Sequence, residues 1–461
     1  MRPTAVCLLA SLALAPPASA QAVDVDEDAI DELFDEWDSR RTPGAIVAVI
    51  HAGELVFQRA YGMADIRGRV ELEPDMAFPI GEATRHFTTS ALGQLALEGE
   101  LDAEAELKDA FPELELIDQA VRVRDLLAQT DGLNDPRVLW RLSGEERCDE
   151  LTREAALASV LRQRGSGWVE GGEQRNSTLA NWLMLDELLR RESESAVGDV
   201  LQERFFGPLG MEQTRYVDAL QLDQPEFLSY VRADDGLEPA CDTGRWHDPG
   251  LFTSVADLVR WEQELLRRDE EGGELDAWLQ SFSSESLSTL GRALPHLELR
   301  EYRGLSCQAL DARWGSGFAY LRIPDAQLAV ICFTNNWGLL PAAQARRVAE
   351  QCIEFPGDPP RGRFGARNFP DLGDRLPPER IDALLGRYES ADLGGALYRL
   401  TESRGQLSLR LPDRSKHGAV AFEDGILLPR SSLTLRFDPD SADVLILETT
   451  GASGVRLERV R

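Results

Sequence analysis

The chain has 461 residues, of which 43% are hydrophobic and 28% are charged, and its formal net charge is −31. This length is enough for one large domain and a smaller one, and the composition is that of a globular protein with a full core. Because the acidic residues are spread along the chain, its surface would repel nucleic acid and anionic membranes. We therefore expect neither as a partner.

The first twenty residues have the features of a secretory signal peptide. Arg2 gives the segment a positively charged N-terminal region, and an apolar run follows over 5–15. The sequence ASA at 18–20 fits the small-x-small cleavage rule. No later stretch approaches the roughly 18 apolar residues that a membrane helix needs. We expect cleavage after Ala20 and an exported protein, periplasmic or extracellular, with no transmembrane segment.

The cysteine and histidine residues predict neither a metal site nor a particular disulfide. The cysteines beyond the signal peptide are odd in number and irregularly spaced: they are Cys148, Cys241, Cys307, Cys332 and Cys352. The chain has no C-x-x-C pair and no H-E-x-x-H motif. We therefore expect no metal and no cofactor.

The larger part of the chain alternates strand-like and helical patterns. Apolar residues at helical spacing predict an amphipathic helix over 30–37, and two apolar runs around Ala52-Gly53 predict a hairpin over 43–65. The pattern then predicts helices at the following ranges: 87–98, 121–129, 179–192 and 255–268. Pro324-Asp325 predicts the turn of a second hairpin over 320–336.

The composition and the hydrophobic pattern of the sequence change after residue 355. Residues 356–378 are dense in Pro, Gly and Arg without periodicity, which is typical of a linker. Short alternating runs separated by turn residues follow over 379–461 and predict a small all-β domain. The expected organisation is a signal peptide over 1–20, an α+β domain over 21–355, the linker and the β domain.

Six segments, in order and at the expected spacing, resemble the serine β-lactamase-like family of class C β-lactamases, D-alanyl-D-alanine carboxypeptidases and penicillin-binding proteins. The segments include "FPIGEATRHFTTSALGQLALEG", "VRVRDLLAQTDGL", "FFGPLGMEQTRY" and "PGLFTSVADLVRW". The resemblance covers residues 29–355 and implies an antiparallel sheet flanked by helices, with a helical subdomain. The C-terminal segment resembles the lipocalin-like extra domain of some members.

The resemblance implies acyl transfer by a serine, a lysine base one turn later, a Tyr-x-Asn motif and a Lys/His-x-Gly strand. The matching positions hold other residues, with the last match placed to within a residue or two: Glu82 for Ser, Arg85 for Lys, Gln174 for Tyr, and Leu310 for Lys or His. Arginine keeps its proton in proteins, so Arg85 cannot be the base. No catalytic residue of the family is intact.

Three hypotheses account for Glu82. It is a nucleophile or general base that works with a second carboxylate, such as Glu170 or Glu173, as in glycosidases. Alternatively, it forms an ion pair with Arg85 that fills the former serine–lysine pocket. Catalysis by Thr84 is not expected, because His86, two residues later on a helix, would point to another face.

The third hypothesis is a charged pocket that holds a ligand without turning it over. Glu82, Arg85, Arg175 and Asn176 are its candidate contacts, and arginine favours a carboxylate group. The sequence thus predicts an exported, non-catalytic binding protein for a peptidoglycan-type peptide, another cell-wall-derived ligand or a protein partner. The alternatives are an active peptidase, esterase or β-lactamase with an atypical site, and a structural relic with a plugged pocket.

Overall fold

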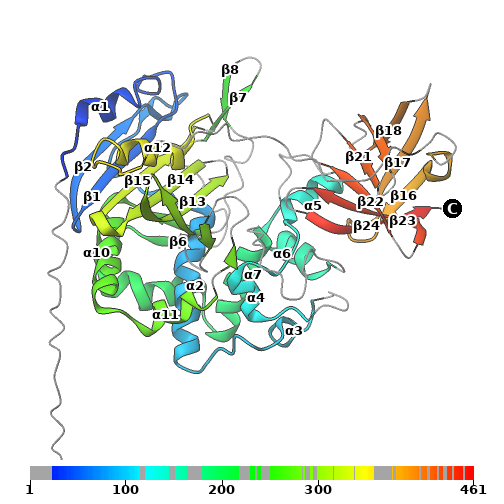
Figure 1. Ribbon diagram of the computed structural model, residues 1–461, viewed down its shortest axis with the longest axis horizontal. Helices are drawn as coiled ribbons and strands as arrows, with labels where there is room; N and C mark the ends of the chain where they lie inside the picture. Colours follow the sequence, from blue (N-terminus) through cyan, green and yellow to red (C-terminus); the bar gives the residue numbers. More distant parts are fainter. Residues whose placement is uncertain are drawn as a thin grey trace, which may run out of the picture.

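A computed structural model describes residues 23–460, apart from several segments. The segments outside the description are 115–119, 145–150, 164–178, 218–228, 234–235, 240–249, 283, 286–290, 294–297, 315, 337, 358–375, 377–380, 404–405, 413–415, 423–424, 429–432, 439–440 and 450–451. None of the described helices combines the length and the hydrophobicity that a membrane crossing requires. Figure 1 shows a larger part of sheet and helices, and a second sheet formed by the C-terminal residues.

The larger part is built on an antiparallel sheet of eight described strands, in the order β10-β11-β12-β13-β14-β15-β1-β2. The strands are β1 (Ala45–His51), β2 (Glu54–Tyr61), β10 (Ser284–Glu285), β11 (Gly291–Ala293), β12 (Glu298–Tyr302), β13 (Leu305–Trp314), β14 (Ser316–Ile323) and β15 (Leu328–Thr334). Both predicted hairpins form, as β1–β2 and β14–β15. β1 pairs with β15, which brings the two hairpins together in the middle of the sheet.

Both faces of this sheet are covered. Along β1, Ile46 and Ile50 pack into one hydrophobic cluster and Val47 and Val49 into another, as the alternation of a strand requires. Helices α1 (Glu27–Glu32) and α12 (Pro341–Ala349) lie on one face, and α2 (Arg85–Leu97) and α10 (Val255–Glu271) on the other (Figure 1). β1 is therefore buried on both sides.

The remaining helices extend the second face into a helical subdomain. They are α3 (Leu107–Ala110), α4 (Val123–Ala128), α5 (Pro136–Leu142), α6 (Arg153–Leu161), α7 (Leu179–Glu192), α8 (Val197–Leu201), α9 (Gly207–Leu209) and α11 (Glu274–Gln280). The predicted helix over 30–37 is displaced, since α1 ends at Glu32 and turns follow. Asp26 caps α1 earlier, while Ile30 and Phe34 still pack beneath the sheet.

Short strands complete the larger part. They are β3 (Met63–Asp65) with β4 (Val70–Glu71), β5 (Phe78–Pro79) with β9 (Gly250–Thr253) and β6 (Arg215–Val217), and β7 (Tyr230–Ala233) with β8 (Gly236–Pro239). Strand β9 lies between β5 and β6. It therefore ties the segment that enters α2 to residues far along the chain.

The C-terminal residues form one antiparallel sheet of nine described strands. These are β16 (Gly386–Ser390), β17 (Ala396–Ser403), β18 (Gln406–Arg410), β19 (Lys416–Gly418), β20 (Val420–Phe422), β21 (Gly425–Leu427), β22 (Thr434–Asp438), β23 (Ser441–Thr449) and β24 (Ala452–Val460). The predicted α+β core with an all-β C-terminal part is confirmed. The core of this sheet also receives Val138, Leu139 and Leu142 from α5.

Candidate functional site

Glu82 lies on a short 3-10 helix, η1 (Gly81–Thr84), that leads directly into α2. Gly81 has φ +51°, in the left-handed region that favours glycine. A Cβ at Gly81 would lie 3.6 Å from that of Ala312 on β13, so the turn is held against this strand. The structure thus places the turn that carries Glu82 beside the strand that carries Leu310.

The third motif position lies on β13, and the side chains that β13 directs into the core there are apolar. Leu310 and Ala312 are both buried, in the same hydrophobic cluster as Ala83. Asp311 accepts a hydrogen bond from Arg300 Nη2 at 2.8 Å. Leu310 and Ala312 thus present apolar side chains at the position that the resemblance assigns to Lys or His.

The carboxylate of Glu82 is held by Arg137, not by the predicted Arg85. Arg137 Nη2 donates to Glu82 Oε1 at 2.9 Å and to Asp135 Oδ2 at 2.7 Å. The exposed side-chain fractions are 21% for Glu82, 11% for Arg137 and 8% for Asp135. The prediction of a Glu82–Arg85 pair is corrected to this triad of Glu82, Arg137 and Asp135. Its members come from η1 and from the start of α5.

Asp135 anchors the triad. Its Oδ1 accepts from the backbone N–H of Arg137 at 2.8 Å, as an N-cap of α5, and its Oδ2 accepts from Leu179 N–H at 3.2 Å. Burial opposes ionisation of Asp135, but the charge and hydrogen bonds of Arg137 outweigh it, so the pKa of Asp135 is lowered. A buried anion therefore fixes Arg137, which in turn orients Glu82.

Other predicted site residues are buried or lie outside the described residues. Arg85 begins α2 and is only 4% exposed. Gln174, Arg175 and Asn176 fall in the undescribed segment 164–178, together with the carboxylates proposed as partners of Glu82. The role of Arg85, Arg175 and Asn176 as ligand contacts stays a prediction.

Thr84 and His86 serve the packing around Glu82. The Thr84 hydroxyl accepts a hydrogen bond from the backbone N–H of Leu251 on β9, at 2.9 Å. His86 Nε2 accepts from the indole N–H of Trp261 at 2.9 Å, and both side chains are buried. The two residues hold α2 against different neighbours, so they do not form a nucleophile–base pair.

A second buried carboxylate lies near the subdomain core. Asp131 accepts hydrogen bonds from Asn181 Nδ2 at 2.7 Å and from Leu133 N–H at 2.9 Å. Burial raises the pKa of Asp131 to about 7. Asp131 thus joins the loop after α4 to α7. Within the described segments, no group of three or more His, Cys, Asp or Glu side chains could hold a metal ion.

Sequence reasoning missed Arg137 and Asp135. The Asp-Pro pair at 135–136 is a recognisable helix start, with an N-cap followed by proline at the first helical position. That signal locates α5 but says nothing of its contact with Glu82. The two residues of the ion pair are 55 positions apart in the chain.

Comparison with known proteins connects this geometry to a family. The Beta-lactamase family model matches residues 28–353. A D-aminopeptidase of Brucella anthropi is 32% identical over 239 residues, which are 50% of this chain and 44% of that protein. A D-aminopeptidase of Cereibacter sphaeroides is 29% identical over 252 residues, 53% of this chain and 48% of that protein. The matches thus span less than half of these relatives.

Solved structures share the fold. The octameric penicillin-binding protein homologue of Pyrococcus abyssi has a TM-score of 0.61 and 18% identity, and the match covers 94% of this chain and 99% of that one. The D-amino acid amidase of Ochrobactrum anthropi, complexed with L-phenylalanine, has a TM-score of 0.57 and 17% identity, over 70% of this chain and 97% of that one.

These comparisons correct the functional prediction. The prediction of a non-catalytic binding protein is wrong, because the curated relatives are named for a peptidase activity. The alternative of an active hydrolase with an atypical site agrees better with the comparisons. The matched region contains η1, α2 and β13, and so includes Glu82, Arg85 and Leu310. By sequence and by fold, this chain belongs to the Beta-lactamase family.

Proposed function

We propose that this protein is an exported amide hydrolase that acts on substrates containing a D-amino acid, with Glu82 as the reacting carboxylate. The relatives named D-aminopeptidases and the neighbour named a D-amino acid amidase support the substrate class. The observation that carries the proposal is the position of Glu82. It lies on the turn into α2, the position to which the family resemblance assigns the nucleophile, and it is partly exposed there.

The triad leaves one carboxylate oxygen of Glu82 available. Oε1 accepts from Arg137, whereas Oε2 accepts no hydrogen bond from the residues that the structure describes. Because Arg137 is itself held by Asp135, the orientation of Glu82 is set before a substrate arrives. Oε2 can therefore receive a proton from a water molecule placed over η1.

The proposed reaction uses Glu82 as a general base and then as a general acid. Oε2 takes a proton from water as the water oxygen bonds to the carbonyl carbon of the amide. When the C–N bond breaks, the electron pair stays on nitrogen, and Glu82 returns the proton to the leaving amine. The products are a carboxylic acid and an amine, and Glu82 is ionised again. Arginine at position 85 is no obstacle, since this route needs no neutral lysine.

The test measures release of D-phenylalanine from D-phenylalaninamide by the purified protein. Glu82→Gln is expected to lower kcat at least about 100-fold, because positioned acid–base groups contribute about 10²–10⁴-fold. Glu100→Gln is the control, since Glu100 is exposed and lies beyond the end of α2. No turnover by the unchanged protein, or equal turnover by Glu82→Gln, would overturn the proposal.

A second experiment tests the placement of Glu82. The triple variant Glu82→Ser, Arg85→Lys, Gln174→Tyr restores the serine, lysine and tyrosine that the family resemblance implies. If Glu82 stands in the serine position, the triple variant should react with a fluorophosphonate, which labels activated serines, while the unchanged protein should not. Labelling of the unchanged protein would instead assign the chemistry to a hydroxyl group and reject Glu82.

A further inference from the structure

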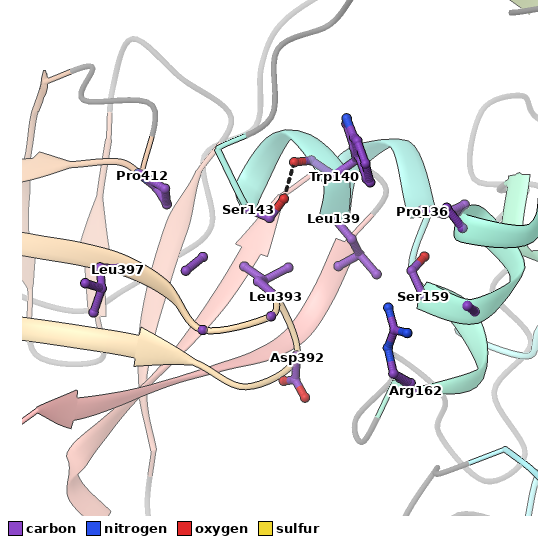
Figure 2. Close-up of a pocket in the computed structure, with 15 residues that line it drawn as sticks. Pro136, Leu139, Trp140, Ser143, Ser159, Arg162, Asp392, Leu393, Leu397 and Pro412 are labelled. Atoms are coloured by element: carbon purple, nitrogen blue, oxygen red, sulfur yellow. Dashed lines mark hydrogen bonds between the residues drawn. The ribbon is translucent and has the colours of Figure 1, made fainter. Parts of the chain in front are cut away.

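A cavity of about 640 Å³ lies between the helical subdomain and the C-terminal sheet. Figure 2 shows its two walls, which come from α5 and α6 on one side and from the β16–β17 turn on the other. This volume is within the range of about 300–1,000 Å³ of sites that hold small organic ligands. The cavity therefore has the size of a small-molecule site.

The lining combines apolar side chains with polar groups. Its apolar side chains are Pro136, Leu139, Trp140, Ala155, Ala158, Leu393, Ala396, Leu397 and Pro412. The hydroxyls of Ser143 and Ser159 already donate to backbone oxygens, at 2.6 Å and 2.7 Å. A ligand that fills this space would bury an apolar body against the walls.

The cationic side chain of the lining is Arg162, an exposed residue directly after α6. Figure 2 shows the guanidinium of Arg162 extending toward Ser159 and Leu139. Arg162 makes no ion pair or side-chain hydrogen bond with the part of the chain that the structure describes. The described residues therefore do not occupy its donors, which can bind an anionic group of a ligand.

The acidic residue of the lining does not neutralise Arg162. The carboxylate of Asp392 points away from Arg162 in Figure 2, and its Oδ2 accepts from the backbone N–H of Arg456 at 3.1 Å. The planar guanidinium of Arg162 can donate two parallel hydrogen bonds to the two oxygens of a carboxylate. A hydroxyl group offers only one oxygen and cannot accept this pair. The end of the cavity beside Arg162, away from the carboxylate of Asp392, thus favours an anionic group on a ligand with an apolar body.

We propose that this cavity binds a small apolar carboxylate, with its body between α5 and the β16–β17 turn and its carboxylate on Arg162. The site is separate from the triad. Arg137 of α5 holds Glu82, whereas Pro136 and Leu139 of the same helix line the cavity. The proposal does not depend on the reaction assigned to Glu82.

Binding is tested by isothermal titration calorimetry with 3-phenylpropanoate, which contains no amide bond. Arg162→Gln is expected to weaken binding at least tenfold. The uncharged 3-phenylpropan-1-ol should bind the unchanged protein at least tenfold more weakly than 3-phenylpropanoate does. Ala158→Phe, which places a ring in the cavity, should abolish binding. Arg399→Gln is the matched control, because Arg399 is an exposed arginine of β17 outside the lining, and it should leave the affinity unchanged.

Each variant is compared at a temperature at which its thermal unfolding curve shows a folded protein. No heat of binding by the unchanged protein at millimolar 3-phenylpropanoate would overturn the proposal. Equal affinity of Arg162→Gln, or unchanged binding by Ala158→Phe, would overturn it as well, because binding would then occur elsewhere. Hydrolysis of D-phenylalaninamide is measured separately, so failure of one proposal does not affect the other.

Discussion

The geometry around Glu82 is decided by three charged side chains. Glu82 has a carboxylate that is partly exposed and is oriented by a guanidinium, which is itself fixed by a buried aspartate. Charge-assisted hydrogen bonds of this kind restrict the geometry of both partners. The three residues therefore form one unit, and removing the middle one should affect both the stability of the fold and the orientation of Glu82.

Arg137→Met is expected to lower the free energy of unfolding at pH 7 by about 3–5 kcal/mol, since Asp135 would be left as a buried, uncompensated charge. The folded pKa of Asp135 is below its usual 3.8, so its stabilising contribution is present above that pH and is lost as pH falls through the folded pKa. The difference between variant and unchanged protein should therefore shrink on acidification.

Urea unfolding at pH 7 and near pH 3.5 measures this difference. Arg137→Lys serves as the control, since it keeps a positive charge beside Asp135. An equal loss of stability for Arg137→Met at both pH values would show that the effect comes from packing and not from the charge of Asp135.

The elements around Glu82 are held by contacts between segments that are distant in the chain. Leu251 on strand β9 makes two of these contacts. Its backbone oxygen accepts a hydrogen bond from the Ile80 N–H at 3.0 Å, and its own N–H donates to the Thr84 hydroxyl at 2.9 Å. A Cβ at Gly250 would lie 2.8 Å from that hydroxyl, so the backbone of β9 passes close to Thr84. η1 is therefore clamped between β9 and β13.

Thr84→Val should lower the free energy of unfolding by about 1–3 kcal/mol, because the buried N–H of Leu251 would lose its acceptor. Valine has nearly the same shape as threonine, so little of this effect would come from packing. Thr84→Ser retains the acceptor and is expected to cost less. Denaturant unfolding compares the three proteins, and equal stability of Thr84→Val and the unchanged protein would show that this hydrogen bond does not hold η1 in place.

The two large parts of the molecule share α5. Its N-terminal end holds Glu82 through Arg137, while Val138, Leu139 and Leu142 enter the core of the C-terminal sheet. The hydroxyl of Tyr398 on β17 also donates to the backbone oxygen of Leu142. The C-terminal sheet is thus packed on the same helix that orients the proposed catalytic carboxylate.

Leu142→Ala is expected to destabilise the protein by about 2–5 kcal/mol, as large-to-small changes in a packed core do. The loss should be visible in the urea midpoint measured by near-ultraviolet circular dichroism. Leu97→Ala is the matched control, because Leu97 is 45% exposed and should change the midpoint little. Similar midpoints for the two variants would mean that α5 contributes little to the C-terminal core.

Much of the fold could be predicted because its signals are local. The hairpins around Gly53 and Pro324 follow from alternating apolar residues and turn residues within a few positions. The bounds of the first helix were displaced, because Asp26 caps it earlier than the apolar spacing alone indicates. Packing of β1 on both faces follows from its continuous apolar run.

The amino-acid sequence alone indicated the family and the α+β architecture, because motif order and residue identity are written along the chain, and it predicted that Glu82 and Arg85 replace the serine and lysine of the family. Only the tertiary structure decided that Glu82 pairs with Arg137 and that a cavity forms beside Arg162. Both depend on where α5 lies in space. No local spacing encodes a contact across 55 residues or a space between two packed parts of the molecule.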